Sequence, residues 1–139
     1  MSYKTLEHAT DAIVEVTADS MSEAFQVAGI SVIETILDIS KVDEVYTKKI
    51  QVNGKDHKYL LYNWLEEMII LTITEGFAGK KISLDISENN EGLTINAEIV
   101  GEKIDLKKHD FKVEIKSPTF HDMRIKEEKK ITMRYLLDL

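Results

Sequence analysis

The sequence contains no cysteine, a single proline and only six glycines among its 139 residues. The absence of cysteine excludes disulfide bonds, thiolate zinc sites and cysteine nucleophiles. No Ser/Gly/Pro-rich stretch separates two halves, so residues 1–139 are expected to form one domain. The first residues, MSYKTLEHATD, are polar and acidic and do not resemble a secretory signal. Together with the absence of cysteine, this predicts a cytoplasmic location.

The sequence also lacks a long uninterrupted apolar run. The most apolar stretch, YLLYNWLEEMIILTIT from Tyr59 to Thr74, contains Asn63, Glu66 and Glu67. A membrane-spanning helix needs about 20 consecutive apolar residues. This stretch therefore predicts a buried amphipathic helix, and no association with a membrane is expected.

Positive charge is in deficit, because 18 Lys and Arg residues face 25 Asp and Glu residues and leave a formal net charge of −7. The basic residues cluster only in short pairs beside acids, namely Lys48-Lys49, Lys80-Lys81, Lys107-Lys108 and Lys129-Lys130. Nucleic-acid-binding domains usually carry an extended basic patch. No direct contact with nucleic acid is expected, and a role in an RNA pathway would require another protein.

The hydrophobic pattern predicts two helices. Ser20 and Glu23 form a capping box that starts a helix ending near Ser40. The second helix is expected from Lys58 to Glu75. Apolar residues at three- and four-residue spacing form one buried stripe on each helix. The stripe of the first helix is Ala24, Phe25, Ala28, Val32 and Ile36. The stripe of the second helix is Leu61, Leu65, Met68, Ile69 and Ile73, with Trp64 beside it.

Alternating or β-branched segments predict the strands, at 11–16, 44–52, 81–86, 93–100, 111–115, 123–125 and 130–139. The later strands are joined by short turns, which favours antiparallel pairing. The expected fold class is α+β, a two-layer sandwich in which a mainly antiparallel sheet is covered by two helices.

Two acidic features lie at opposite extremities of the chain. Glu7, His8 and Asp11 fall in the segment LEHATD before the first predicted strand, and Asp138 precedes the α-carboxylate of Leu139. Carboxylate oxygens are the ligands that hard divalent cations prefer, and adjacent anions without a cation would repel. The alternatives are a polar start of a strand, with Asp11 bonded to nearby backbone, and an ordinary exposed chain end. If the first and last strands are antiparallel neighbours, the acids would meet in one site.

A third polar feature is the segment SPTFHDMRI, in which Pro118 ends a strand or opens a turn and His121-Asp122 follows. A His–Asp pair can perform acid–base chemistry, but no nucleophile with a recognisable context accompanies it. His8 and His121 could ligate zinc, although two scattered histidines are weak support. A turn histidine bonded to backbone is favoured. No phosphate-binding glycine loop, zinc-protease motif or EF-hand is present.

Five segments together resemble the archease family over about Tyr3 to Leu139. These segments are LEHATD, SMSEAFQVAGISVIETILDISKV, LLYNWLEEMIIL, IKSPTFHDMRI and YLLDL. They are similar in order and spacing to the family's L-E-H-T-A-D motif, its two helices, its T-Y-H-D-M block and its V-V-L-D-[IL] terminus. The chain departs from this pattern at Ala9-Thr10-Asp11, where the acid keeps its place and the hydroxyl moves by one residue.

The resemblance implies a non-catalytic partner of the RtcB-type tRNA-splicing RNA ligase, which promotes guanylylation and multiple turnover of that enzyme. It implies metal ligation by Asp11, Asp138 and the Leu139 carboxylate. It further suggests that four residues orient the ligands or contact the ligase, namely Glu7, His8, His121 and Asp122. Ca²⁺ is the cation most readily expected in a crystal, with Mg²⁺ or Mn²⁺ as alternatives. Two other functions stay open, a metal-dependent hydrolase and a chaperone-like protein-binding module.

Overall fold

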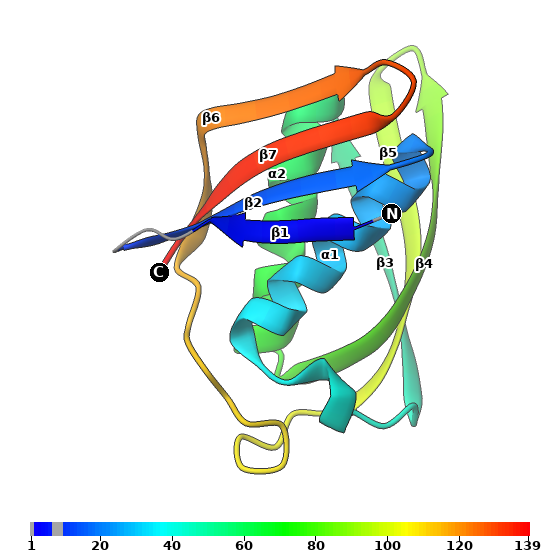
Figure 1. The fold of residues 1–139 in the computed structure, drawn as a ribbon. Helices are drawn as coiled ribbons and strands as arrows, with labels where there is room; N and C mark the ends of the chain where they lie inside the picture. Colours follow the sequence, from blue (N-terminus) through cyan, green and yellow to red (C-terminus); the bar gives the residue numbers. More distant parts are fainter. Residues whose placement is uncertain (1, 7–9) are drawn as a thin grey trace.

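The computed structural model describes residues 2–6 and 10–139, which form two α-helices and seven strands in two antiparallel sheets (Figure 1). The four-stranded sheet has the order β1 (Ser2–Leu6), β2 (Asp11–Ala18), β7 (Ile131–Asp138), β6 (Ser117–Glu127). The three-stranded sheet has the order β3 (Tyr46–Gly54), β5 (Gly92–Lys103), β4 (Phe77–Asn89). The helices are α1 (Met21–Ile36) and α2 (His57–Ile69).

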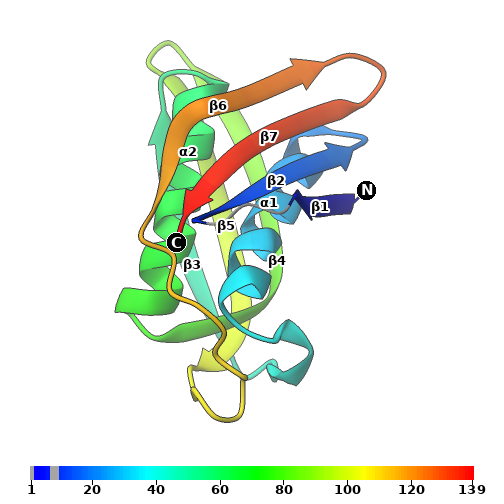
Figure 2. The same ribbon diagram turned by 60° about the vertical axis from the view of Figure 1, so that its left-hand side comes forward.

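The two helices lie between the two sheets (Figures 1 and 2). Helix α1 packs against β2 and β4, and α2 packs against β3 and β6, so each helix contacts both sheets. The apolar surface of α1 explains why this helix lies between two sheets, because Val27 and Ile33 are buried in addition to the predicted stripe. A helix that is apolar over most of its circumference needs cover on two sides. The α+β class and the antiparallel pairing are confirmed, while the strands form two sheets instead of the single one expected.

The contact between the helices centres on Trp64, which is fully buried. Its indole Nε1–H donates to the backbone carbonyl of Phe25 at 2.8 Å, which satisfies the one polar atom of the ring. Gly29 of α1 lies against the same ring, because an added Cβ there would stand 2.9 Å from Cζ2 of Trp64. The close approach of α1 to α2 therefore depends on a glycine at this position.

The ends of the helices follow local capping chemistry. The Ser20 hydroxyl accepts from the Glu23 N–H at 3.2 Å, as the capping box predicts. Helix α1 ends at Ile36, earlier than expected, and a short 3₁₀ turn follows at Ile39–Lys41. Helix α2 continues into a π-helical turn at Ile70–Thr74, so together they span the predicted second helix.

The predicted strand at 111–115 is wrong, because residues 104–116 form turns and irregular backbone. Its fully buried His109 fixes this segment. The Asp105 N–H donates to His109 Nδ1 at 3.0 Å, and His109 Nε2 lies 3.0 Å from a Glu102 carboxylate oxygen. The Lys112 N–H donates to the Ile36 carbonyl at 2.7 Å, so the backbone at 111–115 bonds to the end of α1 instead of to a neighbouring strand.

Two further differences concern the four-stranded sheet. Strand β1 was not expected, and it lies at one edge of that sheet beside β2. Pro118 was expected to end a strand or open a turn, yet it lies within β6, opposite Leu137. Strand β6 forms the other edge, where a proline is tolerated. In the described part of the chain, neither helix has the length and apolarity needed to cross a membrane.

Candidate metal site

The two acids predicted from opposite extremities of the sequence lie opposite each other in the four-stranded sheet. Strands β2 and β7 are antiparallel neighbours, and their register pairs Asp11 with Asp138. The Leu139 N–H donates to the Thr10 carbonyl at 3.1 Å, so the ladder continues to the last residue. Figure 2 shows the start of β2 and the end of β7 meeting beside the C label. The expected pairing of these two strands is therefore confirmed.

Strand β6 extends this arrangement across a third strand. Ser117 pairs with Asp138 from the other side of β7, and the Lys116 N–H donates to the Asp138 carbonyl at 2.7 Å. The neighbours Ala12 and Leu137 are buried. Because side chains alternate along a strand, Asp11 and Asp138 project from the face that points away from the helices. We call Asp11, Asp138 and the adjacent Leu139 carboxyl end the acidic row.

An open depression of about 600 Å³ lies over this end of the sheet. Its lining residues come from β2, α2, β6 and β7, and they are Asp11, Tyr62, Ser117, Pro118, Thr119, Phe120, His121, Leu136 and Asp138. Three residues predicted from the sequence, namely Asp11, His121 and Asp138, thus line one cleft. Asp122 is not among the lining residues.

A wide bulge in β6 places His121 at this cleft. Thr119 pairs with Leu136 and Arg124 pairs with Arg134, so residues 120–123 stand opposite a single residue of β7. Asp122 adopts a left-handed backbone conformation, with φ of 55°, which aspartate tolerates better than most residues. Bulges of this kind redirect side chains beside functional sites.

The side chain of His121 is exposed and contacts its neighbour. Its Nε2 lies 3.5 Å from Asp122 Oδ2, and Arg124 Nη2 lies 4.0 Å from the other oxygen of the same carboxylate. The His121 backbone N–H donates to the Thr119 hydroxyl at 3.1 Å. The histidine therefore lies at a turn-like bulge with a local backbone bond, and it forms the His–Asp pair considered from the sequence.

The described residues bring two aspartates together at this end of the sheet. Within residues 2–6 and 10–139, no group of three or more His, Cys, Asp or Glu side chains is arranged to hold a metal. Glu7 and His8 lie outside the described residues. The carboxylates that the structure brings together here are those of Asp11 and Asp138. These oxygen anions fit a hard divalent cation, and Cβ atoms of residues opposite each other are about 4.5–5.5 Å apart.

Sequence reasoning missed an aromatic cluster, in which Tyr62 and Phe120 line the cleft and Tyr59 packs behind them. The rings of Tyr62 and Phe120 are stacked, with centroids 4.3 Å apart and planes 8° from parallel. Tyr59 lies one helical turn before Tyr62, and its ring centroid is 5.1 Å from that of Phe120. The only signal in the sequence was a pair of tyrosines at i and i+3 on the second helix, outside its apolar stripe.

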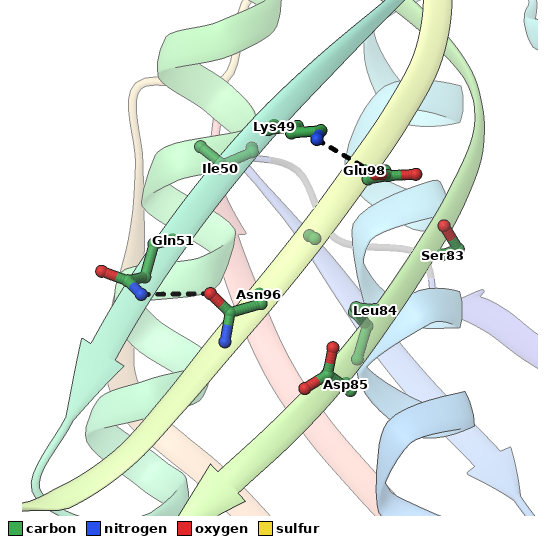
Figure 3. Close-up of a pocket in the computed structure, with 9 residues that line it drawn as sticks. Lys49, Ile50, Gln51, Ser83, Leu84, Asp85, Asn96 and Glu98 are labelled. Carbon is green, nitrogen blue, oxygen red and sulfur yellow. Dashed lines mark hydrogen bonds and ion pairs between the residues drawn. The ribbon is translucent and has the colours of Figure 1, made fainter.

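A second hollow, on the outer face of the three-stranded sheet, has a different character (Figure 3). Its polar side chains pair across strands, with Gln51 donating to Asn96 at 3.0 Å and Lys49 lying 3.8 Å from Glu98. These pairs match the strand register, since Gln51 is opposite Asn96. Cross-strand pairs of polar side chains such as these are typical of a sheet face that is exposed to solvent.

The fold and the acidic row define a small α+β domain in which an early strand and the last strand pair and bring carboxylates together. The sequence matches the model of the Archease protein family (MTH1598/TM1083) over residues 3–139, and the chain belongs to this family. It is 34% identical to the protein archease of Pyrococcus abyssi over 121 residues, which are 87% of this chain and 85% of that protein.

A second curated relative and one solved structure extend the similarity to nearly the whole chain. Protein archease of Saccharolobus islandicus is 31% identical over 139 residues, covering 99% of each chain. The solution structure of Methanobacterium thermoautotrophicum protein 1598 superposes with a TM-score of 0.85 at 28% identity and covers 99% of each chain. The resemblance identified from the five segments is confirmed at the level of the family.

Proposed function

We propose that this chain activates an RtcB-type tRNA-splicing RNA ligase without catalysing a reaction itself. It promotes guanylylation of the ligase and its return to further turnovers. Membership of the archease family supports this role. The observation that carries it is the register of β2 and β7, which sets Asp11 directly opposite Asp138.

The proposed functional site consists of the acidic row and a divalent cation bound to it. Asp11, Asp138 and the Leu139 carboxylate are the ligands, with Ca²⁺, Mg²⁺ or Mn²⁺ as the ion. Like charges directly opposite in a ladder repel, and a bound cation relieves this repulsion. His121 and Asp122, together with Glu7 and His8, orient the ligands or contact the ligase. When bound, the ion offers a positive centre to the phosphates of the ligase's nucleotide.

The direct test is ligation of split tRNA by the cognate ligase, kept below the substrate concentration, with and without this protein. We expect the protein to convert a single round of joining into multiple turnover and to raise the yield of guanylylated ligase. No change in either quantity would contradict the proposed function. Turnover of a phosphoester by the purified protein alone would favour the metal-dependent hydrolase instead.

Two modes of activation are open to such a site, and two variants separate them. The protein can supply a metal ion to the ligase, or it can stabilise one conformation of the ligase by binding that conformation more tightly. Guanylylation is measured with Asp11→Ala and Asp138→Ala proteins at rising metal concentration. Full recovery at saturating metal indicates metal supply, whereas no recovery indicates a docking role for the acidic row.

A further inference from the structure

Three aromatic side chains, two of them exposed and Tyr62 half-buried, lie together near the acidic row. Tyr59 and Tyr62 come from the first two turns of α2, and Phe120 comes from the bulge in β6. We call these three residues the aromatic shelf. Phe120 is 43% exposed and Tyr59 is 41% exposed. Contiguous exposed apolar patches, unlike single exposed side chains, mark binding sites.

The shelf and the acidic row belong to one surface. Tyr62 and Phe120 line the same cleft as Asp11 and Asp138. Stacking of Phe120 on Tyr62 holds the two rings at a fixed separation of 4.3 Å. A partner residue that enters the cleft therefore meets both the stacked rings and the carboxylates among its lining residues.

The shelf already accepts a cation from within the chain. The Lys55 ammonium lies over the Tyr59 ring, 4.2 Å from its centroid. Ring faces carry negative electrostatic potential and attract ammonium and guanidinium groups. The whole chain carries a formal net charge of −7, so long-range attraction also favours a basic partner surface.

We propose that the aromatic shelf docks an arginine- or lysine-bearing segment of the ligase, whose cationic side chain lies against Phe120 and faces the acidic row. This inference rests on the proposed function, because it names the surface that meets the ligase. The shelf supplies the affinity of docking, and the acidic row supplies the cation site. An RNA base stacked on Phe120 is the competing occupant, but its phosphates would approach Asp11 and Asp138.

The test compares Phe120→Leu with wild-type protein. Leucine keeps an apolar side chain and removes the ring face. The dissociation constant for the full-length ligase is measured at saturating Mg²⁺ by titration calorimetry, at low and high salt. We expect binding to weaken roughly three- to tenfold. Ca²⁺ binding by the variant alone is expected to stay at the wild-type level.

Two further variants keep the test decisive. Tyr59→Leu removes a second exposed ring and should weaken ligase binding in the same direction, even if Phe120→Leu perturbs the bulge. Phe111→Leu is the matched control, because Phe111 is 39% exposed in the segment between β5 and β6 and takes no part in the ring contacts that define the aromatic shelf. It should bind the ligase as wild type does.

Wild-type affinity in both shelf variants, or equal losses in Phe111→Leu, would overturn the inference. Binding of split tRNA by the protein alone that is lost in Phe120→Leu would overturn it in favour of a nucleobase site. These outcomes differ from failure of the proposed function, in which the wild-type protein neither binds nor stimulates the ligase.

Discussion

At the residue scale, Tyr135 places a hydroxyl in the middle of the core, where it is fully buried. Its Oη lies 2.5 Å from the Ser31 hydroxyl oxygen, and Ser31 in turn donates to the Ala28 carbonyl at 2.6 Å. The tyrosine is therefore the donor to Ser31. Burial raises the pKa of Tyr135, so the phenol stays protonated and remains a donor. The short chain of bonds satisfies each polar atom inside an apolar interior.

We predict that Ser31→Ala lowers the free energy of unfolding by about 1–3 kcal/mol, because it leaves the buried Tyr135 hydroxyl without its acceptor. Tyr135→Phe should cost less, since it removes the donor itself. The double variant should be more stable than the sum of the single losses implies. Urea unfolding of the four proteins measures the coupling. Strict additivity would show that the hydrogen bond contributes nothing.

The acidic row makes a second prediction at this scale. In EDTA, Asp138→Asn should leave the melting temperature unchanged or raise it, because the like charge opposite Asp11 is removed. Adding Ca²⁺ at about one hundred times its dissociation constant should stabilise wild type by about 2.7 kcal/mol. The same addition should barely affect Asp138→Asn. Asp85→Asn, an exposed acid on the other sheet, controls for net charge, and an equal loss of the Ca²⁺ response there would refute the site.

At the scale of elements, the segment between β5 and β6 is held by a cluster around Glu102. The carboxylate accepts from Lys108 Nζ at 2.7 Å and from the Asp43 N–H at 2.8 Å, and it lies 3.0 Å from His109 Nε2. These contacts, with Lys108 the strongest, lower the pKa of Glu102 from its ordinary value of 4.5 to about 2. The folded protein thus favours the ionised carboxylate.

A pH-dependent contribution to stability follows. Because the folded pKa lies below the unfolded one, the contribution is complete above about pH 4.5 and is lost as the pH falls toward 2. We predict that Glu102→Gln lowers the melting temperature at pH 6 and that its difference from wild type narrows at pH 3. Glu66→Gln, on an exposed position of α2, corrects for the change in charge. A difference that stays constant between the two pH values would contradict the assignment.

Sequence patterns predicted the elements that local chemistry determines. The capping box at Ser20 starts α1 as expected, and the apolar spacing located α2. The strand expected at 111–115 failed because its backbone is anchored from outside the segment, by the bonds from the Phe111 N–H to the Leu106 carbonyl and from the Lys112 N–H to the Ile36 carbonyl. The bulge in β6 could not be predicted for the same reason. It is a shift in the pairing of β6 with β7, and the alternation of side chains within β6 contains no information about that pairing.

At the scale of the whole molecule, the candidate site depends on how distant segments come together. Asp11 and Asp138 were predicted from the sequence as candidate ligands because they carry carboxylates. The pairing of β2 with β7 makes them neighbours. The aromatic shelf could not be predicted in this way, because the contact of Tyr62 with Phe120 requires α2 to pack against β6. Residue chemistry proposes candidates, whereas the packing of elements decides which of them share a surface.

The pairing of β2 with β7 leads to a prediction about the carboxyl-terminal residue, which lies beside Asp11 and Asp138. Leu139 follows β7 directly, and its N–H is bonded to the Thr10 carbonyl, so any residue added after it would emerge at the acidic row. We predict that a Gly-Ser extension after Leu139 weakens Ca²⁺ binding and ligase activation, because it converts a charged donor into a neutral amide and crowds the cation.

An amino-terminal Gly-Ser extension is the matched control, and urea unfolding in EDTA should show all three proteins equally stable. The fold does not need the charge, since the Leu139 side chain packs against the core and the hydrogen bond from the Leu139 N–H to the Thr10 carbonyl is kept. A carboxyl-terminally extended protein that binds Ca²⁺ and activates the ligase as strongly as the unmodified chain would remove the terminal carboxylate from the ligand set. The two aspartates would then require their remaining ligands from other groups.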